Sequence, residues 1–401
     1  MTQVLRGNIV HAPEMGRLDI LEHGCLVLED GVITGLYRQL PEELANAEVR
    51  DFGDRLIMQS FADMHLHAPQ YPMLGMGMDL PLLDWLNTYT FPTESRFADL
   101  DYARRTYQRL ASDLITNGTT RVAMFSSLHT EATWVLMEEL EKTGVTGYVG
   151  KVNMDRNGLP GVLQETTEES IRETVRWLDG CHFEHVKPII TPRFTPSCTN
   201  ELMTQLGKLA NERGLYVQSH LSENTNEIAW VRELHPDCTQ YWETYNKYGM
   251  WKDHTLMAHC VHSDERERRA IKDAGVVVVH CADSNVNICS GICPVRQMVR
   301  EGLWVTLGSD IAGGAQLPMY KVITMSIRTS KARRVTDQWH PDFLTVPEGY
   351  YLGTTSGHKY FGAGDGFAVG DKLHAVVIDD GDFPEAAHAL TVQERFERAI
   401  Y

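Results

Sequence analysis

Short apolar runs alternate with segments of helical periodicity through the middle of the chain. Eight such runs predict strands, at residues 57–66, 120–126, 147–153, 186–193, 216–220, 255–259, 276–280 and 304–309. Runs rich in Val and Ile, bounded by turn residues, are typical of parallel strands that are covered on both faces. Eight strand and helix pairs therefore predict an α/β fold, a closed (β/α)8 TIM barrel over residues 59–364.

The segments between these strands carry helix signals. A helix is expected over residues 263–275, with Ser263 at the N-cap, acidic residues in the first turn and Gly275 at the end. In a barrel of this kind, catalytic side chains project from the C-terminal ends of the strands. Polar residues at those positions are therefore the first candidates for a site.

Both ends of the chain carry strand signals. The sequence Asp30-Gly31 before an apolar segment predicts a hairpin turn, because glycine tolerates the positive φ that the turn requires. The run 368–379 is again strand-like, after three glycines that neither follow a strand nor open a helix, as a phosphate-binding loop would. We expect residues 1–58 and 365–401 to form one small β-sandwich lobe.

Composition narrows the classes of partner. The 401 residues have 43% hydrophobic and 23% charged side chains and a net charge of −17, which disfavours nucleic acid in the absence of a local basic patch. The eight cysteines contain no C-x-x-C pair and predict reduced thiols in the cytoplasm. No apolar run is long enough to cross a bilayer, so no membrane association is expected.

Two histidines one residue apart end the first barrel strand. Because side chains alternate along a strand, His65 and His67 are expected on the same face, where both can reach one metal ion. With 17 histidines in 401 residues, one such pair also arises readily by chance. The pair gains weight only from matching residues at other strand ends.

Such residues follow four of the later strands. They are Arg193, His220, His259 and Asp310, at the ends of the fourth, fifth, sixth and eighth strands. Taken singly, His259 also fits a satisfied core histidine, and Asp310 a helix cap. Together with the histidine pair, all of them fall on one rim of the barrel, as a catalytic site would.

The residue types on this rim suit metal-assisted hydrolysis. Three imidazoles and one carboxylate are ligands for zinc, and iron(II) fits the same set. Such an ion lowers the pKa of a bound water to about 7. Glu223, three residues after His220, is placed to move protons, although an acid at a helix N-terminus is its structural alternative.

Eight blocks of sequence carry a family resemblance. They are residues 65–72 (HLHAPQYP), 80–86 (LPLLDWL), 90–94 (TFPTE), 191–194 (TPRF), 219–224 (SHLSEN), 258–260 (AHC), 308–314 (GSDIAGG) and 394–401 (ERFERAIY). On these blocks the chain resembles the guanine deaminases of the amidohydrolase superfamily over essentially its whole length. The first block is specific to that family, whereas the paired histidines and the aspartate after strand eight mark only the superfamily.

The resemblance implies one zinc ion per subunit, a homodimer, and guanine and water as substrates. It implies a role for each site residue. The metal ligands would be His65, His67, His220 and Asp310; the catalytic groups Glu223, His259 and Asp310; and the substrate-binding residues Gln70, Arg193 and Phe194 together with His220, Glu223 and Asp310. Arg193 fits its role physically, because its fork can donate to the carbonyl oxygen that guanine has and adenine lacks. The products would be xanthine and ammonia.

Two alternatives stay open on sequence grounds. The substrate could be another aminated ring, such as a pterin, 8-oxoguanine or cytosine, or the fold could be an inactive scaffold. A zinc deaminase of the cytidine type is excluded: His182 and Glu184 match its H-x-E pattern, but the required C-x-x-C is absent.

Overall fold

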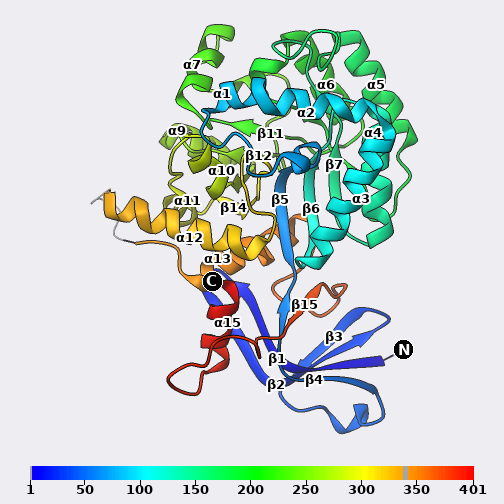
Figure 1. The fold of residues 1–401 in the computed structure, drawn as a ribbon, viewed down its shortest axis with the longest axis vertical. Coiled ribbons are helices and arrows are strands. Elements are labelled where there is room, and N and C mark those ends of the chain that lie inside the picture. Colours follow the sequence, from blue (N-terminus) through cyan, green and yellow to red (C-terminus); the bar gives the residue numbers. More distant parts are fainter. Residues whose placement is uncertain (1, 337–341) are drawn as a thin grey trace.

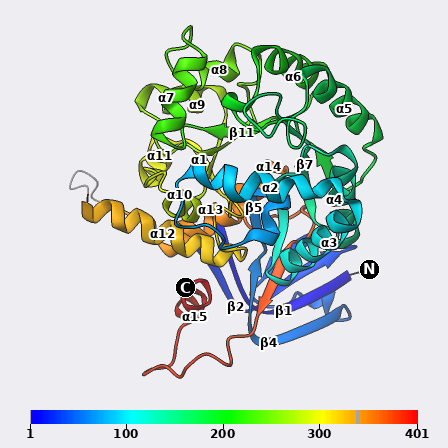
Figure 2. The same cartoon turned by 45° about the horizontal axis from the view of Figure 1, so that its top comes forward.

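The computed structural model describes residues 2–336 and 342–401. A large body of alternating strands and helices lies above a smaller lobe of strands (Figure 1). In the view of Figure 2, helices surround the strands of the large body, and the strands of the lobe gather below them. The predicted barrel and a lobe built from both ends of the chain are therefore present.

Eight strands in the large body correspond to the eight apolar runs. They are β5 (Phe61–His67), β6 (Thr119–Phe125), β7 (Thr146–Gly150), β9 (Val186–Pro188), β11 (Gln218–Leu221), β12 (Leu256–His259), β13 (Val277–His280) and β14 (Trp304–Leu307). Two further strands are short and continue β7 and β9 after one and two residues: β8 (Val152–Asn153) and β10 (Thr191–Pro192). All pairs within these sheets are parallel, as the apolar pattern predicts.

The two halves of the barrel meet through backbone hydrogen bonds. On one side, the Ile190 N–H donates to Tyr216 and the Gln218 N–H donates to Ile190, at 3.0 and 2.9 Å. On the other, the Asp310 N–H donates to the His65 carbonyl at 2.8 Å. The same two junctions carry Arg193, His220 and Asp310, so closing the barrel also brings the candidate residues together.

The helices follow the strands in the expected alternation. The longer ones are α3 (Leu100–Thr116), α4 (Thr130–Thr143), α5 (Thr167–Gly180), α6 (Asn200–Glu212), α7 (Thr225–Leu234), α9 (Glu265–Ala274), α11 (Val295–Glu301), α12 (Met319–Thr336), α13 (Val346–Gly353) and α15 (Val392–Ile400). Shorter turns are η1 (Glu42–Leu44), η2 (Ala68–Met73), α1 (Leu82–Trp85), η3 (Leu86–Thr90), α2 (Phe91–Ser95), η4 (Arg96–Ala98), η5 (Thr195–Ser197), α8 (Glu243–Asn246), α10 (Ala282–Asn287) and α14 (Thr355–Tyr360). Gly275 ends α9 with a positive φ as predicted, but its N-cap is Asp264 and not Ser263, because the Asp264 side chain accepts the Glu267 N–H.

The strands of the lobe form one five-stranded sheet, and residues 371–373, just before its last strand, hydrogen-bond back to Gly31 and Ile33 at its other edge. Its order is β15 (Ala375–Ile378), β4 (Glu48–Gln59), β1 (Thr2–Glu14), β2 (Arg17–Glu29) and β3 (Val32–Tyr37). Apolar side chains on it form two separate clusters, and the long strands β1 and β2 change register along their length. Leu26 and Leu28 belong to one cluster and Cys25 and Val27 to the other, so the clusters lie on opposite faces of the sheet. Leu40 and Leu44, from the segment between β3 and β4, cover the second cluster. The predicted turn is present, with positive φ at both Asp30 and Gly31.

Two further differences concern boundaries. The predicted strand over residues 57–66 is two strands, because β4 belongs to the lobe and the chain crosses at Ser60 into β5 of the barrel. The C-terminal segment adds helix α15 to the strands that were expected there. The division into residues 1–58 plus 365–401 and residues 59–364 stays a prediction.

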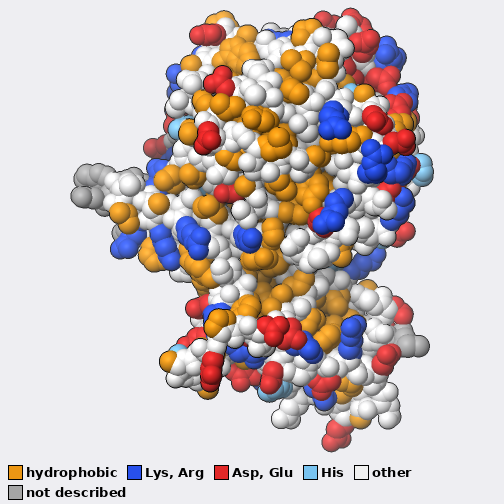
Figure 3. Space-filling model, viewed as in Figure 1, with side chains coloured by type: hydrophobic (Ala, Val, Ile, Leu, Met, Phe, Trp, Pro, Cys, Tyr) orange, Lys and Arg blue, Asp and Glu red, His pale blue; other side chains and the backbone are white. Residues whose placement is uncertain are grey.

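Charge is distributed less evenly than the sequence suggested. On the face seen in Figure 3, blue side chains form a row along α12, whereas elsewhere they are mixed with acidic ones. Arg328 and Lys331 of this helix stack on the Tyr401 ring, at 5.9 and 5.7 Å from its centroid. The expectation of no local basic patch therefore needs this amendment. In the described part of the chain, no helix is both long and apolar enough to cross a membrane.

Candidate active site

The paired histidines lie where strand alternation places them. β5 is buried along its whole length, and the rings of His65 and His67 are perpendicular with centroids 5.0 Å apart. His220, on β11, brings its Nε2 to 3.2 Å from Nε2 of His67. The Nδ1–H of His220 donates to the Arg193 carbonyl at 2.6 Å, which leaves the lone pair on Nε2. Two ring nitrogens thus meet from different strands.

Asp310 completes this cluster from the segment after β14. Its Oδ1 lies 3.2 Å from Nε2 of His65 and 3.5 Å from Nε2 of His67. Burial alone would raise the pKa of Asp310, but the hydrogen bond and charge of His65, with the charges of His259 and His67, hold it well below its usual value. The residue is therefore a carboxylate near neutral pH.

The cluster fits a divalent metal ion. The ligand atoms of His65, His67 and His220 all lie within 4.8 Å of one another, as do those of His65, His259 and Asp310. Burial and the nearby His65 lower the pKa values of His67 and His220 well below the usual value, so these rings are neutral. Nδ1 of His67 has no hydrogen-bond partner among the described residues. Neutral imidazoles around a carboxylate are typical metal ligands.

Glu223 and His259 lie beside the cluster. Nε2 of His259 is 3.5 Å from Oε2 of Glu223 and 3.8 Å from Oδ2 of Asp310. Burial raises the pKa of Glu223 to about 7, although the charge of His259 opposes the shift. Burial alone would lower the pKa of His259, but the charges of Glu223 and Asp310 outweigh it and raise the pKa. A carboxyl group with a pKa near neutrality is suited to taking up and releasing a proton.

One cavity joins this cluster to the predicted substrate-binding residues. It is lined by His67, Gln70, Leu82, Trp85, Leu86, Arg193, Phe194, His220, Glu223, His259, Ile288 and Asp310. Apolar and aromatic side chains with a few convergent polar groups are usual for a small flat ligand. The structure thus brings every predicted site residue but His65 to one cavity, and the ring of His65 contacts those of His67 and His220, which line it.

Residues 56–395 match the model of the amidohydrolase family. The chain belongs to the amidohydrolase family. This amidohydrolase is 36% identical over 426 residues to the guanine deaminase of Dictyostelium discoideum, with 100% of this chain and 94% of the relative covered. It is 36% identical to the guanine deaminase of Mus musculus, with 94% and 86% covered.

A solved structure gives the same family. The crystal structure of the guanine deaminase of C. acetobutylicum, with guanine bound in its active site, superposes on this amidohydrolase with a TM-score of 0.96. The two are 42% identical, and the match covers 100% of this chain and 96% of the other. The family predicted from the sequence blocks is therefore confirmed.

Glu94 is a site residue that the sequence argument did not single out. Its carboxylate accepts hydrogen bonds from both terminal nitrogens of Arg193, at 2.6 and 3.0 Å, and from Nε2 of Gln70 at 2.9 Å. Oε1 of Gln70 accepts the Ala312 N–H at 3.0 Å. Glu94 therefore fixes the orientation of both predicted ring-binding side chains. Its place in the block 90–94 was the available signal.

Asp63 and Asn285 were also missed. Asp63 shares a strand face with the two histidines, and its Oδ1 accepts the Ser309 N–H at 2.9 Å, which holds β5 to the segment before Asp310. Asn285 Oδ1 lies 2.9 Å from Nδ1 of His259 and orients that ring. The strand period could have found Asp63. Nothing local marks Asn285, because it comes from the helix after a different strand.

Proposed function

We propose that this amidohydrolase catalyses the hydrolytic deamination of guanine to xanthine and ammonia, with one zinc ion per chain. The observation that carries the proposal is the single cavity in which the donors of Gln70 and Arg193 and the carboxyl group of Glu223 converge beside the histidine cluster. The likeness to guanine deaminases, one of them with guanine bound, supports this substrate over other aminated rings.

Zinc, with iron(II) as the alternative, would be held by His65, His67, His220 and Asp310. The chemistry that such an ion supplies is Lewis acidity, which makes a water nucleophilic at neutral pH. Asp310 adds the negative charge that the three neutral rings lack. The Arg193 carbonyl and Asp63 hold the ligands in position.

The side chains of the cavity orient the ring and move the protons. Gln70 and Arg193 keep N–H donors beyond those that bind Glu94. The free Arg193 donors would bind the carbonyl oxygen of guanine. Phe194 and Trp85 cover the ring and exclude bulk water. Glu223, with Asp310 beside it, moves two protons: one passes from the attacking water to the ring nitrogen, and the second passes from the newly added hydroxyl to the amine, which leaves as ammonia. His259 stabilises the negative charge that develops.

The direct test is to add guanine to metal-replete protein and measure xanthine and ammonia. We expect one ammonia released for each xanthine formed, and slower turnover of a pterin, 8-oxoguanine and cytosine. If one of these rings is turned over faster than guanine, that ring is the preferred substrate in place of guanine. If protein that holds stoichiometric metal turns over none of these compounds, the alternative of an inactive scaffold is favoured.

Substitution of Arg193 by lysine is expected to raise KM for guanine about tenfold or more, because a hydrogen bond to a charged group contributes about 1.5–3 kcal/mol and each 1.4 kcal/mol is tenfold. A lysine cannot reproduce the bidentate fork that binds Glu94 and the ring. Steady-state kinetics measure this. Arg213→Lys is the matched control, because Arg213 forms an exposed ion pair with Asp179 outside the cavity. This variant should keep the wild-type KM. An unchanged KM in Arg193→Lys would make Arg193 structural.

The pH dependence should follow Glu223. Because its carboxylate is the active form, kcat/KM is expected to fall as the pH drops below about 7, by about tenfold per pH unit. The positive charge of the bound ion favours the carboxylate and moves this limb to lower pH, not to higher pH. A pH profile of kcat/KM measures the limb. A rise in kcat/KM on acidification would contradict the role of Glu223 as a base.

Oligomeric state and location extend the same proposal. We expect a homodimer, which light scattering of the purified protein measures. A cytoplasmic location is supported by the eight cysteines, all of which are free. Fractionation of cells that produce the protein checks the location.

A further inference from the structure

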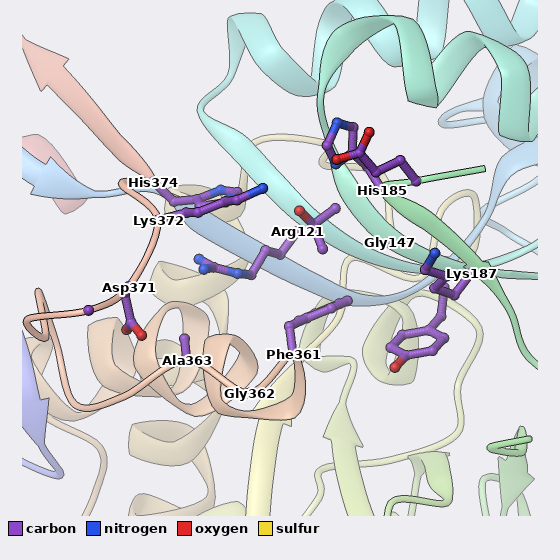
Figure 4. A pocket seen from close by; sticks show the side chains of 14 residues that line it. Arg121, Gly147, His185, Lys187, Phe361, Gly362, Ala363, Asp371, Lys372 and His374 are labelled. Atoms are coloured by element: carbon purple, nitrogen blue, oxygen red, sulfur yellow. The ribbon is translucent and has the colours of Figure 1, made fainter. Parts of the chain in front are cut away.

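A second, larger cavity lies at the opposite end of the barrel strands from the histidine cluster. Its volume is about 400 Å³, and it opens between the starts of β6, β7 and β9 and the segment that leads from α14 to β15. Figure 4 shows the Arg121 side chain reaching into it, with Lys372 and His374 on one side and Phe361 on the other. None of the residues assigned above to deamination lines this cavity.

Arg121 is a buried cation that has no salt bridge within residues 2–336 and 342–401. It is 6% exposed, and its Nε has no hydrogen-bond partner in the part of the chain that the structure describes. Asp371 is the acidic residue whose charge acts on Arg121. Its Oδ2 already accepts the Gly364 N–H at 2.8 Å. Burial lowers the pKa of Arg121 to about 10, so the guanidinium is still charged near neutral pH. A buried charge of this kind is costly unless an anion pairs with it.

The surroundings of Arg121 are positive although the whole chain has a net charge of −17. Lys187 and Lys372 line the cavity with Arg121, against Glu184 and Asp371. Burial and the charges of Arg121 and Lys372 lower the pKa of His374 to about 3, as expected beside like charges. The cavity therefore favours a negatively charged ligand.

Its apolar wall suits a flat body. The rings of Tyr148 and Phe361 stack with centroids 5.5 Å apart and an interplanar angle of 28°. Both residues line the cavity beside Gly362, where an added Cβ would meet no atom within 4 Å, so a ring can approach the backbone there. An aromatic face next to a cation is a common arrangement for small aromatic acids and phosphate esters.

We propose that this cavity binds a small organic anion, with its carboxylate or phosphate oxygens on Arg121 and Lys372 and its flat body against Phe361. The planar guanidinium presents paired donors that match either group. Because the site is built from both the barrel and the segment before β15, an anion in it bridges the two parts of the fold. The proposal does not depend on the proposed deamination.

The test uses calorimetric titration of the metal-loaded protein with benzoate and with inorganic phosphate. Purines are avoided because they would also enter the proposed active site. We expect saturable binding of benzoate and none of benzamide, its neutral analogue. Arg121→Gln should weaken benzoate binding by at least about tenfold, since it removes a charge-assisted pair. Guanine turnover in this variant should stay at the wild-type level.

Two further variants keep the test decisive. Lys372→Gln changes an exposed side chain, so it should fold normally and weaken binding several-fold. Lys208→Gln, on α6 outside the cavity, removes the same charge and should leave affinity unchanged. Equal affinity of wild type and Arg121→Gln would overturn the proposal. If Arg121→Gln does not fold, equal benzoate affinity of wild type and Lys372→Gln would overturn the proposal. No saturable binding of either anion to wild type would also overturn it.

Discussion

Glu223→Gln is expected to reduce guanine turnover by about 100-fold to 10,000-fold, the range that a general acid and base contributes, while metal content stays unchanged. Glutamine keeps the shape and can still accept the Ser290 hydroxyl, which lies 3.1 Å from Oε1. It cannot take a proton from water. The loss should therefore appear in kcat more than in KM, which steady-state kinetics and metal analysis of the same preparation measure.

The control for this variant is a second buried carboxylate. Glu139, on α4, is 5% exposed and paired with Arg104 and Lys142, far along the chain from the cluster. Glu139→Gln should lose some stability but keep kcat within a few-fold. Near-normal turnover in Glu223→Gln would refute the proton-carrying role of Glu223, whatever Glu139→Gln does.

Asp310→Asn is expected to lower metal affinity by more than about 100-fold, beyond the cost of losing an outer partner of a metal ligand. The substitution keeps the size of the side chain but removes the only negative charge in the set of His65, His67, His220 and Asp310. Turnover should fall with the metal content, and excess zinc should restore only part of it. Elemental analysis after dialysis, followed by activity measured against added zinc, tests this.

Asp283→Asn is the matched control for that variant. Asp283 is 5% exposed, lies on α10 and accepts the Ala315 N–H at 2.7 Å, but it is not part of the histidine cluster. Its metal content should equal that of wild type. Full metal retention in Asp310→Asn would mean that the histidines hold the ion without the carboxylate, and that Asp310 serves another purpose.

The barrel was predictable because its strands are buried on both faces. All four residues of β13, Val277–His280, are buried, so this strand is a short apolar run of the kind that a parallel sheet covered on both faces requires. The helices between the strands follow the helical period. The lobe was less predictable. Its strands are half exposed and bent, so the same alternation fits one curved sheet or two stacked sheets.

The ligand set could be proposed for a related reason. In a parallel barrel every strand ends on the same rim, so a polar residue at a strand end has a known neighbourhood without any knowledge of long-range contacts. His65, His67, Arg193, His220, His259 and Asp310 were found in this way, and the family resemblance then implied which of them are metal ligands. Glu94 was not, because it lies in a series of short helical turns after β5, where no such rule applies.

The sequence alone determined the order of strands and helices, the residue types at the strand ends and, through its blocks, the family. These are local properties, set by side-chain period and chemistry. The tertiary structure decided that Glu94 accepts hydrogen bonds from Arg193, 99 positions away, and that the strands of the lobe form one sheet. It also decided that Arg121 and Lys372 share a cavity. Such pairings depend on how distant segments pack, and no local pattern along the chain specifies them.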